Sequence, residues 1–210
     1  MASQTTREAW DVGAQALAKS HPVPARLLDQ HGPPRLGAKP PAADRFETLG
    51  SAIAHQQLAG KAAAAIWGRV QVAVGPAFTP AAVLEIGPQR LRACGLSSAK
   101  VAAILDLALT TAEGGIQFDR IARLKDQAVI NQLTAVKGIG PWTAQMFLMF
   151  DLRRIDIWPS ADYGVRAGFT RAFKLAEMPT IRELDCLGEP FAPYRSILAW
   201  WCWRETDTKS

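Results

Sequence analysis

The sequence predicts an all-α protein. From Phe46 onward, signals for the beginning and end of helices recur, and apolar residues between them repeat with helical spacing. Few segments alternate polar and apolar residues with the period of two that marks a strand, and strands do not alternate with helices. We therefore expect helices packed on helices, in one compact domain or two small lobes, which suits a length of 210 residues.

Most of the expected helices have a start or a stop that their residues explain. Thr79 and Pro80 are a cap residue followed by proline at the first helical position. Ser97 or Ser98 caps a helix that ends before the glycines at 114 and 115. The first 45 residues are rich in proline, glycine and alanine and predict one short helix followed by a covering arm. The expected helices cover residues 24–30, 53–74, from 80 on, 88–94, 98–113, 126–136, 141–150, 160–174 and 193–204.

Composition restricts the classes of protein without choosing among them. Hydrophobic residues make up 49% of the chain, so a sizeable core is available, and no apolar run reaches the ~18 residues that span a bilayer. The N-terminus lacks the pattern of a secretory signal. The net charge of +5 suits a polyanionic partner, and the basic excess lies between residues 51 and 174. Three widely separated cysteines predict buried apolar side chains in a reducing cytoplasm.

The most informative segment is a glycine-containing corner between two expected helices. One helix ends near Lys137, residues 138–140 form a tight Gly-Ile-Gly turn, and Pro141 opens the next helix. Glycines let another molecule approach the backbone closely, and amides at the start of a helix point outward with the positive end of the helix dipole behind them. Such a corner receives an anion, and in a DNA-binding protein that anion is a backbone phosphate. An ordinary helix–turn–helix corner is the alternative that this turn alone leaves open.

The chain resembles a family at this point. The stretch VKGIGPWTA from Val136 to Ala144, followed by DIWPSADYGVR from Asp156 to Arg166, is similar to the signature of the HhH-GPD base-excision glycosylases, and most similar to the alkylpurine (3-methyladenine) DNA glycosylases. The resemblance covers about residues 46 to 204, with supporting matches at residues 52–58, at 94–97 with Lys100, and at 193–196. It implies a two-lobed fold with a helix–hairpin–helix motif beside a central cleft. An N-terminal β domain, which some members carry, is not expected here.

The resemblance implies that Asp162 is the catalytic carboxylate. A carboxylate near the anomeric carbon stabilises the positive charge that builds on deoxyribose as a base departs, and it can orient water. On residues alone, capping of the helix that begins here is an equal or better explanation. We expect Asp151 and Asp156 to be solvated loop residues without a role in catalysis.

Pocket and DNA-contact residues are also implied by the resemblance. Aromatic faces attract a positively charged alkylated base after it has left the helical stack. The family's second hairpin helix carries a nucleophilic lysine in members that also cut the backbone, and Trp142 stands at that position, so a monofunctional enzyme is expected. The predicted residues are, for the base pocket, Trp142, Met146, Trp203 and Tyr163; for the DNA backbone, Gly138, Ile139, Gly140 and Thr143; and for the wedge that fills the gap, Gln57 or Leu58.

Other expectations concern ligands, partners and organisation. No cofactor is expected, although a monovalent cation among the carbonyls of Thr134, Val136 and Gly138 is implied by the resemblance. The expected partner is double-stranded DNA with damaged bases, bound by a monomer in the cytoplasm or on a bacterial nucleoid, with no membrane association. We expect an arm over residues 1–45, a glycosylase domain over 46–205 with its hairpin motif at about 126–150, and a tail over 206–210.

Two alternatives stay open. A glycosylase for oxidised or deaminated purines would use the same architecture. A DNA-binding module without catalysis would need the hairpin but neither Asp162 nor an aromatic pocket.

Overall fold

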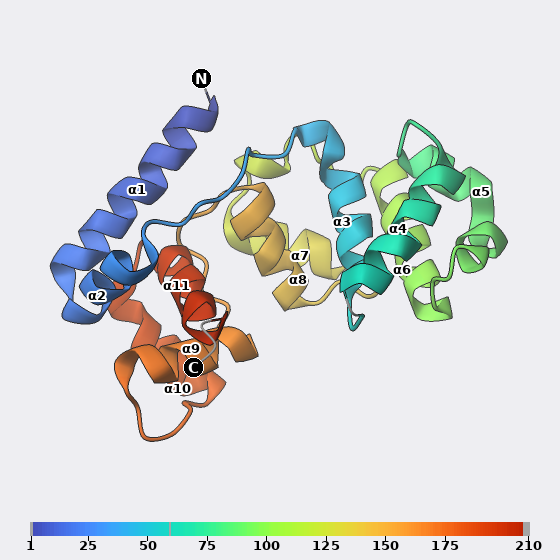
Figure 1. Cartoon of the computed structure of the whole chain (residues 1–210). Coiled ribbons are helices and arrows are strands. Elements are labelled where there is room, and N and C mark those ends of the chain that lie inside the picture. The colour runs from blue at the N-terminus through green and yellow to red at the C-terminus, as the bar shows by residue number, and fades with distance from the viewer. Residues whose placement is uncertain (1, 59, 208–210) are drawn as a thin grey trace. The chain divides into compact units, whose positions relative to one another are not determined.

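The computed structural model describes residues 2–58 and 60–207, and these residues contain helices and turns but no strand. The expected all-α fold is confirmed (Figure 1). No described helix has the length and apolar character needed to cross a membrane. The α-helices are α1 (Ala2–Ser20), α2 (Pro22–His31), α3 (Arg45–His55), α4 (Gly60–Val74), α5 (Pro80–Ala93), α6 (Ser98–Ala112), α7 (Asp126–Thr134), α8 (Pro141–Met146), α9 (Tyr163–Phe173), α10 (Ile181–Gly188) and α11 (Arg195–Asp207).

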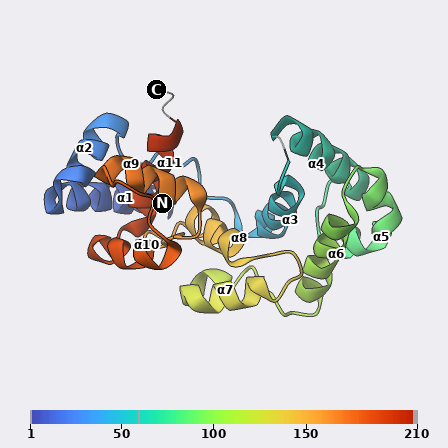
Figure 2. The ribbon, with the colours of Figure 1, turned by 90° about the horizontal axis from the view of Figure 1, so that it is seen from below.

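The chain divides into two compact units. Unit 1 consists of Met1–Lys39 and Leu148–Ser210, and unit 2 consists of Pro40–Phe147. Unit 1 therefore joins the first helices of the chain, α1 and α2, to the last, α9 to α11 (Figures 1 and 2). The single domain over 46–205 and the tail over 206–210 stay predictions. Of that tail, Thr206 and Asp207 belong to α11, and residues 208–210 lie outside the described part.

The N-terminal region contains two helices where the sequence predicts one short helix and an arm. Trp10, Ala14 and Leu17, spaced four and three residues apart on α1, are buried. A side chain at Gly13 would lie 2.6 Å from the Ile197 side chain of α11, so the two helices approach closely. The spacing on α1 was present in the sequence. Pro22 begins α2 and Gly32 follows its end, and the many prolines and glycines of this region obscured the spacing on α1.

The core of unit 1 depends on a tight approach between α9 and α11. Gly168 is buried in the middle of α9, and a Cβ there would lie 1.9 Å from the carbonyl oxygen of Cys202. Phe169 of α9 stacks on Phe173, and Trp201 of α11 is fully buried. Because only glycine lets the backbones meet at residue 168, this residue sets the distance between the two helices.

Unit 2 is built around α6. Its Ile104, Leu107 and Ala108 are fully buried, and Ser97 caps its first turn by accepting a hydrogen bond from the Lys100 amide. The cap at Thr79 on α5 also occurs as expected. The expected break before residue 88 is a kink at Gly87, where φ is 71°.

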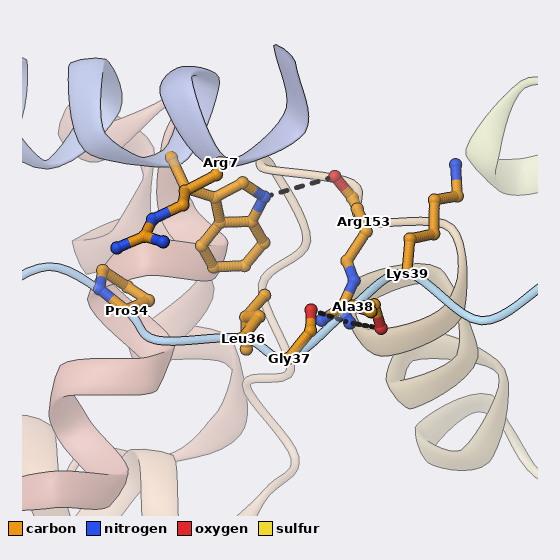
Figure 3. A pocket seen from close by; sticks show the side chains of 8 residues that line it. Arg7, Pro34, Leu36, Gly37, Ala38, Lys39 and Arg153 are labelled. Carbon is orange, nitrogen blue, oxygen red and sulfur yellow. Dashed lines mark hydrogen bonds between the residues drawn. The ribbon is translucent and has the colours of Figure 1, made fainter. Parts of the chain in front are cut away.

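The segment that leads out of α2 is fastened by Arg153 (Figure 3). The Arg153 guanidinium donates to the carbonyl oxygens of Gly37 and Ala38 at 3.0 and 2.9 Å, and the Trp10 indole donates to the Arg153 carbonyl at 3.4 Å. Arg153 has a φ of 63°, a conformation that costs a non-glycine residue roughly 1 kcal/mol. A cavity of about 280 Å³ lies here and contains none of the predicted site residues. We therefore assign Arg153 to holding this segment in place.

The close approach at Gly168 generates a stability prediction. Gly168→Ala places a methyl group against the Cys202 carbonyl, so we expect the free energy of unfolding to fall by about 3 kcal/mol or more. Gly68→Ala, in a helix with nothing within 4 Å of the new Cβ, is the matched control and should raise it by about 0.5–1 kcal/mol. Urea denaturation measures both. Equal stability of the two variants would contradict the packing described here.

Candidate active site

Asp162 lies at the beginning of α9 and caps that helix. Its Oδ1 atom accepts a hydrogen bond from the Val165 amide at 2.8 Å. The same oxygen accepts a second hydrogen bond from the indole Nε1 of Trp203 at 2.9 Å. The side chain is half-buried. Capping is therefore compatible with a chemical role for the same residue, because the cap fixes the orientation of the carboxylate.

Trp203 is held beside Asp162 by the same approach of α9 to α11. A Cβ at Gly164 would lie 2.8 Å from the Trp203 ring and 3.1 Å from Oδ1 of Asp162, so glycine is needed for the indole to reach the carboxylate. The ring centroid of Phe150 lies 5.9 Å from that of Trp203. Phe150 was not singled out in the sequence; its position, four residues after Met146, was the available signal. Tyr163 follows Asp162 and is 72% exposed.

The other titratable groups near this part of unit 1 have structural roles. Asp156 makes a bidentate ion pair with Arg195, in which both oxygen–nitrogen distances are 2.7 Å. Asp151 is buried, so the expectation that both aspartates are solvated loop residues was wrong. Burial, helped by the charges of Glu205 and Asp162, raises the pKa of the Cys202 thiol, which stays protonated.

The cysteines differ from the expectation in one case. Cys94 and Cys202 are buried, as expected, but Cys186 on α10 is exposed. All three are free thiols. The two tryptophans that precede Cys202 differ in burial. Trp201 is fully buried, whereas Trp200 is half-buried under the Arg204 guanidinium, 5.2 Å from its ring centroid.

The glycine corner of unit 2 joins α7 to α8 as the sequence predicts. Gly138 has a φ of 80°, which favours glycine, and a Cβ there would lie 2.8 Å from the Cβ of Ala103. Gly140 precedes α8 as its cap residue, with no side-chain hydrogen bond to the cap and open space where a Cβ would lie. Pro141 occupies the first helical position. The corner therefore presents backbone at Gly140.

The four predicted backbone-contact residues are not equivalent. Ile139 is buried, and its amide donates to the Val136 carbonyl at 3.1 Å, so the residue closes the turn. Thr143 is also buried. The carbonyl of Gly138 accepts a hydrogen bond from the Gln56 side chain at 3.1 Å. Cation binding by the carbonyls of Thr134, Val136 and Gly138 stays a prediction.

Residues predicted for the pocket and the wedge also occur in unit 2. Trp142 is 46% exposed on the first turn of α8, and Met146 at its end is half-buried. Gln57 and Leu58 are exposed in the turn between α3 and α4, and Gln57 has a φ of 55°. Lys100 of α6 donates to the carbonyls at the end of α3. The structure thus joins Asp162 to Trp203 in unit 1 and places the wedge and hairpin candidates in unit 2.

These elements define a helix–hairpin–helix protein in which an aspartate after the hairpin caps the helix that follows it. Residues 51–191 match the family model described as the HhH-GPD superfamily of base excision DNA repair proteins. The chain belongs to this family, as the sequence analysis expected.

Three relatives specify the resemblance. DNA-3-methyladenine glycosylase 1 of Schizosaccharomyces pombe is 36% identical over 162 residues, which cover 76% of this chain and 71% of the relative. The crystal structure of a DNA-3-methyladenine glycosidase from Bacillus halodurans aligns with a TM-score of 0.79 at 33% identity, over 88% of this chain and 84% of that one. The S. pombe 3-methyladenine DNA glycosylase Mag1 in complex with abasic DNA gives 0.75 at 31% identity, over 91% and 95%.

The Asp156–Arg195 pair makes stability depend on pH. Burial raises the pKa of Asp156, but the hydrogen bonds and the charge of Arg195 outweigh it and hold the pKa below its usual value of 3.8. The pair's contribution is complete above that value and is lost as the pH falls through the lower, folded-state pKa. We therefore expect Asp156→Asn to be less stable than the wild type at pH 7, with the difference closing below about pH 4.

Urea unfolding across a pH series measures this effect. The control is Asp119→Asn, which removes a carboxylate from an exposed pair with Arg120 at 3.7 Å. That variant should stay within about 0.5 kcal/mol of the wild type. A difference between wild type and Asp156→Asn that does not change with pH would contradict the assignment.

Proposed function

We propose that this chain is a monofunctional DNA glycosylase. It hydrolyses the N-glycosidic bond of alkylated purines such as 3-methyladenine and 7-methylguanine in double-stranded DNA, and it leaves an abasic site. The observation that carries the proposal is the orientation of Asp162, whose Oδ1 atom is held from two directions by Val165 and Trp203. The relatives named as 3-methyladenine glycosylases support the substrate class.

Asp162 acts through its charge. As the bond between base and sugar lengthens, positive charge develops on the deoxyribose, and a fixed carboxylate nearby lowers the energy of that state. Because Val165 and Trp203 hold the carboxylate in place before the reaction, little reorganisation is needed as the charge appears. The same group orients or deprotonates the attacking water.

The base pocket uses aromatic side chains. In unit 1 we assign Trp203 and Tyr163 to contact with the extruded base, and in unit 2 a role in base recognition for Trp142 and Met146 stays a prediction. Indole faces attract a positively charged ring by ~0.5–2 kcal/mol, which favours alkylated purines over normal ones. An alkylated purine is also a better leaving group, so modest selectivity in binding suffices.

DNA is held by backbone contacts and opened by a wedge. The amides at Gly140 and the first turn of α8 receive a phosphate, with Gly138, Ile139 and Thr143 shaping the corner. Gln57 or Leu58, both exposed at a sharp turn, enters the gap left by the base. The protein works as a monomer on damaged double-stranded DNA, in the cytoplasm or on a bacterial nucleoid.

The reaction ends at base removal. Cutting the backbone through a covalent intermediate requires an amine that attacks the sugar, and the position used for it in bifunctional relatives is Trp142. Lys137 lies before the turn rather than in the second hairpin helix, so it does not occupy that position. We therefore expect an abasic product with an intact strand.

Asp162→Asn tests the role of the charge. Asparagine also caps helices well, so α9 should stay intact while the negative charge is lost. We expect release of 3-methyladenine from methylated duplex DNA to fall by about 10²–10³-fold, with binding to DNA that contains an abasic site retained. Asp29→Asn, which removes an exposed carboxylate on α2, is the control and should keep full activity. Full activity of Asp162→Asn would contradict the site assignment.

A panel of duplexes separates the proposed activity from its alternatives. Each duplex carries one alkylated, oxidised or deaminated purine, and single-turnover release of free base is measured for each. We expect release from the alkylated duplexes and none from 8-oxoguanine. Release of the oxidised or deaminated base alone would identify the other glycosylase class. Binding without release from any duplex would identify a DNA-binding module.

A further inference from the structure

One face of α6 contacts both DNA-contact elements of unit 2. Lys100, Ala103 and Asp106 are spaced by three residues and therefore lie on the same side of the helix. Lys100 contacts the end of α3 and the turn that follows it, whereas Ala103 and Asp106 contact the glycine corner. No role for these residues follows from the reaction chemistry.

The Lys100 ammonium fixes the turn that carries the wedge. Its Nζ atom donates to the carbonyl oxygens of Ala54 and Gln56 at 2.8 and 2.7 Å. Carbonyls in the last turn of a helix lack partners within the helix, and a cation there also opposes the negative end of the helix dipole. The residue that follows, Gln57, is in the left-handed conformation. The direction in which Gln57 and Leu58 leave α3 therefore depends on Lys100.

Asp106 and Ala103 fix the glycine corner from the same helix. Oδ2 of Asp106 accepts a hydrogen bond from the Lys137 amide at 2.7 Å. The backbone of Gly138 packs on Ala103 so closely that a Cβ at residue 138 would lie 2.8 Å from the Ala103 side chain. The corner thus rests directly on α6 on the side where Lys100 also lies.

Gln56 connects the two elements to each other. Its carbonyl accepts from Lys100, and its side-chain amide donates to the carbonyl of Gly138 at 3.1 Å. One residue therefore joins α6, the wedge turn and the glycine corner through hydrogen bonds. Because α6 is anchored in the core of unit 2 by buried residues that include Ile104 and Leu107, the contacts at its face hold the two elements in a fixed relation.

We propose that α6 is a rigid gauge that sets the span between the phosphate held at the corner and the wedge inserted into the DNA, with Lys100 and Gln56 as positioning residues. This inference rests on the proposed function. A phosphate bound at Gly140 then determines where Gln57 or Leu58 enters the stack. Geometry held in advance in this way speeds a reaction without any contact to the reacting atoms.

Lys100→Met tests the gauge, because it keeps the aliphatic stem and removes the donor. The DNA probe is a duplex with 7-methylguanine beside 2-aminopurine, whose fluorescence rises when a wedge unstacks it. We expect the fluorescence change and the single-turnover rate of base release to fall by about 10-fold, whereas affinity for undamaged duplex changes by less than about 2-fold. Lys100→Arg keeps donors for both carbonyls and should restore most of the rate.

Further variants distinguish positioning from general stability. Lys19→Met removes an equal charge from an exposed site on α1 and should change neither signal. Gln56→Met removes the side-chain hydrogen bond to the Gly138 carbonyl and should reproduce the effect of Lys100→Met. It therefore tests the gauge even if the Lys100→Met protein folds poorly. In a background with Gln57 and Leu58 both changed to alanine, adding Lys100→Met should cost less than about 2-fold in rate, because the coupled element is already lost.

The outcomes separate this inference from the function on which it rests. If the alanine pair abolishes the fluorescence change while Lys100→Met and Gln56→Met leave it intact, the gauge is wrong and the wedge stands. The gauge is also wrong if the reductions in rate caused by Lys100→Met and by the alanine pair multiply when the changes are combined in one variant. If the alanine pair leaves the fluorescence change intact, the wedge assignment fails and the gauge fails with it, although base release by Asp162 would still stand.

Discussion

Two hydrogen bonds to a single oxygen atom, Oδ1 of Asp162, are the interaction on which the rest of unit 1 depends. One comes from the amide of Val165 on α9 and the other from the indole of Trp203 on α11. The second can form only if the two helices lie very close together, and this requirement explains the glycines at 164 and 168. The packing of unit 1 and the orientation of its carboxylate are thus consequences of the same helix–helix contact.

The turns of unit 2 are held in position by a different means. Its proposed DNA-contact elements are short turns, and turns of this kind take their shape from what surrounds them. Lys100, Asp106 and Gln56 provide polar contacts, and the close packing of Gly138 on Ala103 provides the steric limit. Carbonyl and amide groups that the turns leave without helical partners are thereby satisfied. The proposed catalytic group is a side chain of unit 1, whereas the proposed contact with DNA is made by the backbone of unit 2.

Many features of the fold could be predicted because they depend on residues close together in the sequence. The caps at Thr79 and Ser97, the glycine corner and the helix after Asp162 follow from residues within a few positions of each other, and the structure has them. Long-range pairs were not predictable, because nothing near Asp156 indicates Arg195 and nothing near Gln56 indicates Gly138. Helix α10 was missed although Thr180 and Glu183 form a capping box, because its apolar face is short.

The uneven burial of the three thiols has a practical consequence. Cys94 and Cys202 are buried, and the raised pKa of Cys202 keeps that sulfur in its unreactive form, whereas Cys186 faces solvent on α10. A maleimide dye added to the native protein therefore attaches at one chosen place without any engineered cysteine. A fluorophore there, in the unit that carries the proposed catalytic carboxylate, would report how that unit tumbles when the enzyme binds a long duplex.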